Sequence, residues 1–155
     1  MDSNIPKDKY HTFALRTISF KERLEFIEYY LKENIKEPSL LIIDGVADLC
    51  ADVNNIEQSN ELVSALMRIS QQQNVHIINV IHQNFGSAKL GTGHLGSALE
   101  KKAETVISLE ANTVNKDWTT VKCGRSRGYS FETFSFEVNE KGLPTIVNDL
   151  YDPLK

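Results

Sequence analysis

The chain has 155 residues, which suits one domain with a sizeable hydrophobic core. Hydrophobic residues make up 41% of the sequence and charged residues 25%, as in an ordinary soluble globular protein. The formal net charge of -4 argues against a generally basic nucleic-acid-binding surface, although it allows a local basic patch.

The sequence has no apolar run of membrane-spanning length and no signal-peptide pattern at its start. We therefore expect a cytoplasmic protein with no membrane partner. Cys50 and Cys123 lie far apart and belong to no CxxC motif. They are expected to be free thiols, which fits a reducing compartment.

The first predicted elements are a tail and a helix. Residues 1–11 are polar and aperiodic, which indicates a flexible tail or loop remnant, and 12–17 are predicted to form a short strand. Ser19 and Glu22 have capping-box spacing, so a helix should start there, and Pro38 should stop it. Its apolar residues recur at helical spacing: Leu24, Ile27, Tyr30, Leu31 and Ile35.

Two strands and a second helix follow. "LLIID" at 40–44 is predicted to be a strand buried on both faces, with Asp44 at its tip, and 75–82 a second buried strand. The helix between them should run to about Gln73. Its apolar stripe consists of Leu62, Val63, Leu66 and Ile69.

The last third of the chain reads as a glycine-rich loop, a helix and three strands. The loop at 85–97 leads into a short helix around 98–104, and 105–110 is a third strand. Two further strands and a turn are expected at 118–127, 132–139 and 141–144. Alternating strands and helices predict a mostly parallel α/β sheet with helices on both faces, and the closing strands should form an antiparallel extension.

Polar residues stand where the first two long strands end. Ligands of open parallel sheets bind beyond the carboxyl ends of the strands. Asp44 ends the first of these strands, and His82 and Gln83 end the second. This placement favours metal-dependent nucleotide chemistry at Asp44, while an aspartate that caps its loop by accepting backbone N–H groups is the alternative.

Four segments, taken in order, resemble a known family. "LLIID" resembles the Walker B strand of RecA-like ATPases, and "VIHQN" resembles the next strand tip in DnaB-type and RepA-type replicative helicases. "GHLGSALEKKAETVISLE" and "KCGRSRG" resemble the family's following helix and late hairpin. The resemblance covers roughly 12–147 and implies a RecA-like fold, ATP and magnesium as cofactors, and a setting in the replication or mobilization of mobile genetic elements.

The resemblance also implies roles for individual residues. Asp44 would hold the water shell of the nucleotide-bound magnesium. His82 and Gln83 would sense the terminal phosphate or couple it to DNA, and Ser97 would belong to the Gly-Ser pair that opens the following helix beside the cofactor.

In the late hairpin, the resemblance makes Lys122 a nucleotide contact and Arg125 and Arg127 candidate arginine fingers that reach a neighbouring subunit. Arg127 is preferred because it lies nearest the turn. Exposed strand-edge charges that discourage aggregation are the alternative for all three.

Lys89 and His94 lie in a glycine-rich stretch, 85–95, which suits contact with single-stranded DNA. Plain flexibility explains this loop as well. The aromatic residues of the hairpin suggest base stacking or, as we favour, packing onto the core; they are Trp118, Phe131, Phe134 and Phe136.

One family motif is missing from the sequence. No GxxxxGK[ST] stretch occurs in the 155 residues, so the glycine N–H groups and lysine that cradle phosphate are absent. We therefore expect 12–155 to be a truncated RecA-like domain, the C-terminal two-thirds, that binds magnesium and ATP poorly and is inactive alone. The missing P-loop strand should leave an open sheet edge, which predicts self-association or a homo-oligomer.

Two alternatives of other classes stay open. One is a magnesium-dependent nuclease or Toprim-like domain that uses Asp44, Asp48 and Asp52, although capping and loop roles are favoured for Asp48 and Asp52. The other is a pure protein-interaction module whose strand tips only pack against a partner.

Overall fold

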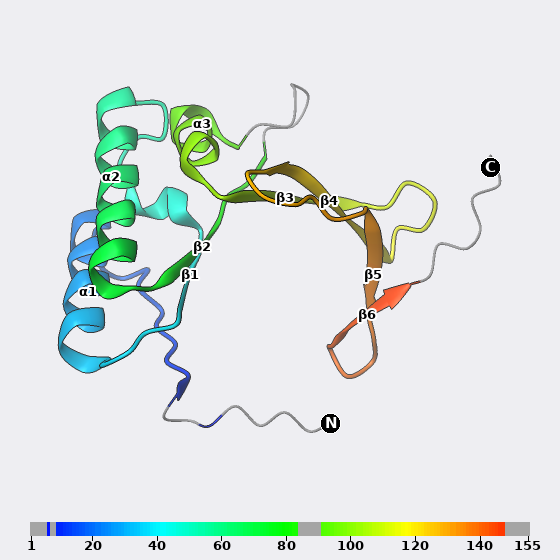
Figure 1. Ribbon diagram of the computed structural model, residues 1–155, viewed down its shortest axis with the longest axis horizontal. Coiled ribbons are helices and arrows are strands. Elements are labelled where there is room, and N and C mark those ends of the chain that lie inside the picture. The colour runs from blue at the N-terminus through cyan, green and yellow to red at the C-terminus, as the bar shows by residue number, and fades with distance from the viewer. Residues whose placement is uncertain (1–5, 7–8, 84–90, 148–155) are drawn as a thin grey trace. The chain divides into compact units, whose positions relative to one another are not determined.

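The computed structural model describes residue 6 and residues 9–83 and 91–147 of the chain (Figure 1). Two compact units make up the chain, Met1–Leu99 and Glu100–Lys155. The prediction of a flexible tail at 1–11 falls largely outside the described residues.

The first unit is built on a parallel pair of strands. Its elements in chain order are α1 (Phe20–Asn34), β1 (Leu40–Asp44), the 3-10 helix η2 (Val46–Leu49), α2 (Ile56–Gln73), β2 (His76–Val80) and the first turns of α3 (Gly93–Lys102). The strands β1 and β2 pair in parallel, with Ile42 opposite Ile78. The prediction of two parallel strands joined by a helix is confirmed.

Helix α1 starts where the capping box predicts. The Ser19 hydroxyl accepts a hydrogen bond from the Glu22 amide, and the Ser19 amide donates to the Glu22 carboxylate at 2.8 Å. Hydrogen bonds with Ser19 hold the pKa of the Glu22 carboxyl below its usual value. The bond with the Ser19 side chain has the larger effect, and the bond with its backbone the smaller. Leu31 is the buried residue of this helix.

Helix α2 starts six residues before its predicted apolar stripe. The Asn55 side chain accepts a hydrogen bond from the Gln58 amide at 3.0 Å and so begins the helix at Ile56. Asn74 ends it in a left-handed conformation with φ of 50°. The predicted end at about Gln73 is therefore confirmed.

The core of the first unit lies against one face of the β1–β2 pair. Helices α1 and α2 lie on the same side of these strands (Figure 1). The buried cluster consists of Leu31, Ile43, Val46, Leu49, Leu62, Val63, Leu66, Ile69, Val75 and Leu95. Val46 and Leu95 are completely buried, which ties η2 and α3 into the same core.

The prediction that the first two strands are buried on both faces is wrong. Four apolar side chains of their second face are 43% to 56% exposed, namely Leu40, Ile42, Ile78 and Val80. In the described part of the chain, helices therefore cover only one face of this parallel pair. An apolar run cannot by itself show whether a second layer covers it.

Two further local predictions are wrong. Residues 12–17 form no strand, since the backbone there is irregular and ends in a turn. The Gly-Ser pair at 96–97 does not open a helix, because α3 already begins at Gly93. Gly96 packs so closely on Gly91 that a Cβ atom at position 96 would lie 2.2 Å from the Gly91 carbonyl carbon. The glycines here serve close packing rather than a loop.

The second unit is a four-stranded antiparallel sheet. Its strands are β3 (Thr105–Ala111), β4 (Trp118–Ser126), β5 (Phe134–Val138) and β6 (Pro144–Val147), paired in that order. The closing strands pair antiparallel as predicted, but among the described strands they form a separate sheet rather than an extension of the parallel one, and β6 was not predicted as a strand. The sheet includes β3, which was expected in the parallel sheet. Among the described strands, β2 pairs only with β1 and β3 only with β4.

Cys50 and Cys123 are both free thiols. Among the helices of the described residues, none is long and apolar enough to cross a lipid bilayer.

Candidate functional site

Asp44 lies at the carboxyl end of β1, where the chain turns sharply. The parallel register sets Asp44 directly beside Val80, the last residue of β2. Gly45 then takes a left-handed conformation with φ of 85°, which glycine adopts without strain, and η2 starts at Val46. The turn leaves the Asp44 side chain exposed at the tip of the strand.

The Asp44 carboxylate has no polar partner among the described residues. It makes no hydrogen bond or ion pair with the described residues, so it does not cap its own loop there. Its exposure also removes the burial cost that a carboxylate on a doubly covered strand would carry. One exposed carboxylate suits magnesium, which keeps several waters and takes few protein ligands beside nucleotide phosphates.

His82 and Gln83 follow β2 by two and three residues and are both exposed. The His82 carbonyl accepts two hydrogen bonds from Thr92, from its amide at 3.1 Å and from its hydroxyl at 2.7 Å. Gln83 forms an isolated antiparallel bridge with Gly91. Because β1 and β2 are neighbours, these residues share one edge of the sheet with Asp44, as predicted.

Thr92 is a site residue that the sequence analysis missed. It fixes the chain after β2 against the start of α3, immediately before Gly93. The start of α3 is also held by Val53, whose carbonyl accepts a hydrogen bond from the Leu95 amide at 3.0 Å. Its hydroxyl bonds to the His82 carbonyl, and a backbone carbonyl as partner leaves no signal in the sequence.

Asp48 and Asp52 have structural partners of their own. The Arg23 guanidinium donates to the Asp48 carbonyl at 2.8 Å and lies 3.9 Å from its carboxylate. The Asp52 carboxylate accepts from the Asn54 amide at 2.8 Å, a typical Asx turn. The described residues include no group of three possible metal ligands.

Arg23 is a second residue that the sequence analysis missed. Its guanidinium also donates to the Leu15 carbonyl at 2.9 Å and to the Arg16 carbonyl at 3.4 Å. The side chain is only 17% exposed. Arg23 therefore ties the segment before α1 to η2, the turn that follows Asp44.

Of the remaining residues predicted near the strand tips, Ser97 lies inside α3 rather than at its start, and His94 is exposed in the first turn of that helix. Lys89 lies outside the described residues, as does most of the predicted DNA-contacting loop at 85–95.

The three basic residues predicted in the late hairpin belong to the second unit. The Lys122 ammonium pairs with the Glu110 carboxylate at 2.6 Å on the same sheet. The Arg127 guanidinium donates to the Lys101 carbonyl at 2.9 Å, at the carboxyl end of α3. Arg125 is exposed, and its side chain makes no hydrogen bond or ion pair with the described residues. Of the two guanidinium groups, that of Arg127 has a hydrogen-bond partner among the described residues and that of Arg125 has none.

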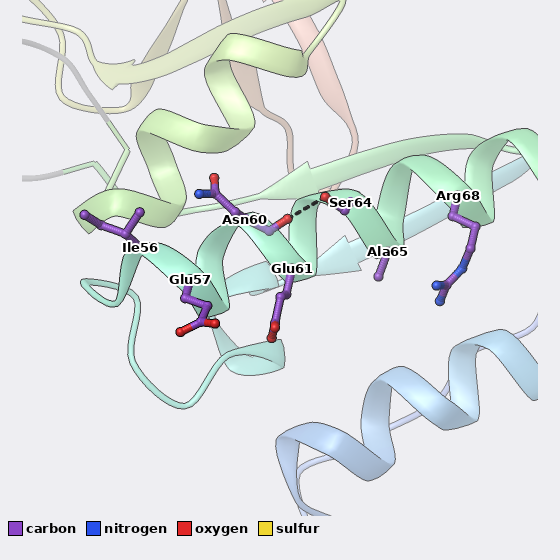
Figure 2. A pocket seen from close by; sticks show the side chains of 7 residues that line it. All are labelled: Ile56, Glu57, Asn60, Glu61, Ser64, Ala65 and Arg68. Atoms are coloured by element: carbon purple, nitrogen blue, oxygen red, sulfur yellow. Dashed lines mark hydrogen bonds between the residues drawn. The ribbon is translucent and has the colours of Figure 1, made fainter.

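A shallow groove runs along α2 and is lined by none of the predicted site residues (Figure 2). Figure 2 shows Glu57 and Glu61 on one side of the helix, and the Ser64 hydroxyl donating to the Asn60 carbonyl at 2.7 Å. Arg68, at the far end, pairs with Glu28 at 2.5 Å. Two carboxylates on the wall oppose phosphate binding, so this groove does not suit a nucleotide.

Comparison of the sequence with protein-family models and with curated proteins gave no match. The chemistry at the strand tips therefore depends on this chain's own residues. They offer one free carboxylate, at Asp44, with an imidazole and an amide at the neighbouring tip, at His82 and Gln83.

Proposed function

We propose that this chain is a truncated RecA-like ATPase domain, related to replicative helicases or mobilization proteins of mobile genetic elements, and inactive alone. In this proposal Asp44 holds the hydrated magnesium of a bound nucleotide, and Gln83, with His82, senses the terminal phosphate. Magnesium would neutralise phosphate charge. The cradle for the other phosphates has to come from outside these 155 residues, which contain no GxxxxGK[ST] stretch.

One observation carries the proposal: the parallel register of β1 and β2, which aligns Asp44 with Val80. Because His82 and Gln83 follow Val80 within three residues, the uncommitted carboxylate and the two polar side chains share the sheet edge at which ligands of parallel sheets bind. The two hydrogen bonds from Thr92 to the His82 carbonyl hold the backbone just after β2, which supports a fixed position for these side chains.

The proposal extends to partners. Arg125 is the better candidate for an arginine finger, since the Arg127 guanidinium already bonds to the Lys101 carbonyl. Single-stranded DNA is proposed to bind through the loop at 85–95, with Lys89 and His94 as contacts. Self-association through unpaired strand edges is also proposed, because β2 has β1 as its only partner among the described strands.

We expect the 155-residue chain to show no significant ATP hydrolysis, because it has no phosphate cradle and no identified water-activating glutamate. Phosphate release with ATP and magnesium should stay below about 0.1 per second, far under ordinary enzyme rates. Asp44→Asn, which keeps the side-chain shape and removes its charge, is the matched variant. A magnesium-dependent turnover above that rate that Asp44→Asn abolishes would show that the chain is a complete enzyme.

A further inference from the structure

An irregular segment before α1, residues 11–18, lies along that helix and is anchored there by aromatic side chains. The Phe13 ring contacts the Phe26 and Tyr30 rings edge to face, with ring centroids 5.0 and 4.5 Å apart. Phe26 and Tyr30 stand four residues apart on α1 and stack at 5.6 Å, so they present one aromatic surface to Phe13. The Tyr30 hydroxyl also forms a hydrogen bond with the His11 Nδ1 at 2.8 Å. We call residues 11–18 the strap.

The other end of the strap is held by Arg23, which lies about two turns before Tyr30 on the same helix. The Arg23 guanidinium donates to the Leu15 carbonyl at 2.9 Å and to the Arg16 carbonyl at 3.4 Å. The helix rises about 10 Å between Arg23 and Tyr30, and the chain from His11 to Leu15 spans at most about 14 Å when extended. The strap therefore runs back along α1 nearly extended, with both of its ends fixed to that helix.

The same guanidinium holds the turn that follows Asp44. It donates at 2.8 Å to the Asp48 carbonyl, which lies in η2. Core packing of Val46 and Leu49 fixes the buried side of η2, whereas Arg23 holds its exposed side at Asp48. Because the Asp44 carboxylate has no polar partner among the described residues, its position depends on the backbone of this turn.

We propose that the strap fixes the turn that carries Asp44, with Phe13 as its anchor and Arg23 as its link to η2. A guanidinium is a rigid, planar group whose donors point in fixed directions, so the carbonyls of the strap determine how it meets the Asp48 carbonyl. When the strap leaves α1, Arg23 loses two of its three carbonyl acceptors among the described residues, and η2 opens more often. Phe13 and Arg23 are therefore positioning residues for Asp44. Their effect on magnesium rests on the proposed function, whereas the coupling of the strap to the turn does not.

Hydrogen exchange in the full chain tests the coupling. Phe13 is 48% exposed and lies outside the buried cluster, so Phe13→Ala should leave the first unit folded. The Ile18 amide donates to the Leu15 carbonyl at 3.3 Å and reports opening of the strap, and the Asp48 amide donates to the Gly45 carbonyl at 2.9 Å and reports opening of the turn. In Phe13→Ala, exchange should rise about tenfold at Ile18, because two aromatic contacts are lost, and several-fold at Asp48.

Two further variants separate the anchor from a general loss of stability. Phe13→Tyr keeps the ring and should restore slow exchange at both Ile18 and Asp48. Tyr29→Ala removes an aromatic side chain of α1 that is 62% exposed and outside the ring contacts of Phe13. It is the matched control and should leave exchange at both amides unchanged.

The link through Arg23 is tested in an Arg23→Gln background, which keeps part of the aliphatic stem and removes the guanidinium. There, Phe13→Ala should still speed exchange at Ile18 but add nothing at Asp48. Exchange at Asp48 that stays slow in the Phe13→Ala single variant would overturn the proposal. So would a Phe13→Ala effect at Asp48 that persists in the Arg23→Gln background.

Manganese–ATP tests whether the strap positions Asp44. Mn²⁺ broadens the NMR signals of amides close to it, and the broadening at Gly45 should weaken in Phe13→Ala, return in Phe13→Tyr and stay at the wild-type level in Tyr29→Ala. Equal broadening in the wild type and Phe13→Ala would overturn the role of Phe13 as a positioning residue. If the wild-type chain shows no broadening at Gly45 while the exchange coupling is present, the strap stands and the proposed function is wrong.

Discussion

Replacement of Gly96 by alanine is expected to destabilise the first unit by about 3 kcal/mol or more. A methyl group at this position would lie 2.2 Å from the Gly91 carbonyl carbon and 2.4 Å from its oxygen, so the backbone of α3 or of Gly91 has to move. Overpacking in a closed interior typically costs about 1–3 kcal/mol, and here backbone rather than a flexible side chain blocks the space.

The sign of this effect is diagnostic. In an ordinary helix interior, Gly→Ala stabilises by about 1 kcal/mol, so a loss at position 96 isolates the close approach to Gly91. Gly128→Ala is the matched control, because nothing lies within 4 Å of a Cβ atom there. Thermal and urea unfolding should show a clear decrease for Gly96→Ala and almost none for Gly128→Ala. A stabilised Gly96→Ala would show that α3 does not pack on Gly91.

Arg23→Ala is expected to cost about 2–3 kcal/mol of folding free energy. The mostly buried guanidinium donates to the Leu15 and Asp48 carbonyls at 2.9 and 2.8 Å, and its removal leaves these acceptors unpaired. Because Arg23 holds η2, amide hydrogen exchange at 46–49 should rise together with the loss of stability measured in urea.

Two variants separate the contributions of Arg23. Asp48→Asn should cost less than about 1 kcal/mol, because the Asp48 carboxylate is 64% exposed and 3.9 Å from the guanidinium, while the carbonyl bond remains. Arg16→Ala, at an exposed arginine on the same segment, should be nearly neutral. If Asp48→Asn destabilised as much as Arg23→Ala, the ion pair rather than the carbonyl bonds would hold η2.

The sequence allowed the helices and most strands to be predicted because their signals are local. Ser19 and Glu22 form the capping box within the first turn of one helix, and the stripe of α2 repeats within a single segment. Asn55, which moves the start of α2 to Ile56, was a local signal as well, but it lies outside the apolar stripe.

The pairing and covering of strands could not be predicted in the same way. The apolar run of β1 is compatible with one covered face or two, and only distant parts of the chain decide this. The prediction of a single sheet was wrong for the same reason. The strand β3 pairs with β4, and the residues of β3 alone do not determine this partner. Gly96 was assigned to a loop because its contact with Gly91 is invisible in a list of residue types.

For the site, strand order predicted that Asp44, His82 and Gln83 would share an edge, because neighbouring parallel strands end together. Arg23 and Thr92 were missed since both act through backbone carbonyls, at Leu15, Asp48 and His82, which any sequence would supply.

If the tips of β1 and β2 form the magnesium–nucleotide site, manganese–ATP should bind there. Mn²⁺ replaces Mg²⁺ and broadens the NMR signals of nearby amides, so millimolar binding without a phosphate cradle is still detected. We predict broadening at Asp44, Gly45 and Gln83 that disappears in Asp44→Asn. Broadening that instead centres on Glu57 and Glu61, or that persists unchanged in Asp44→Asn, would show that the ion binds elsewhere.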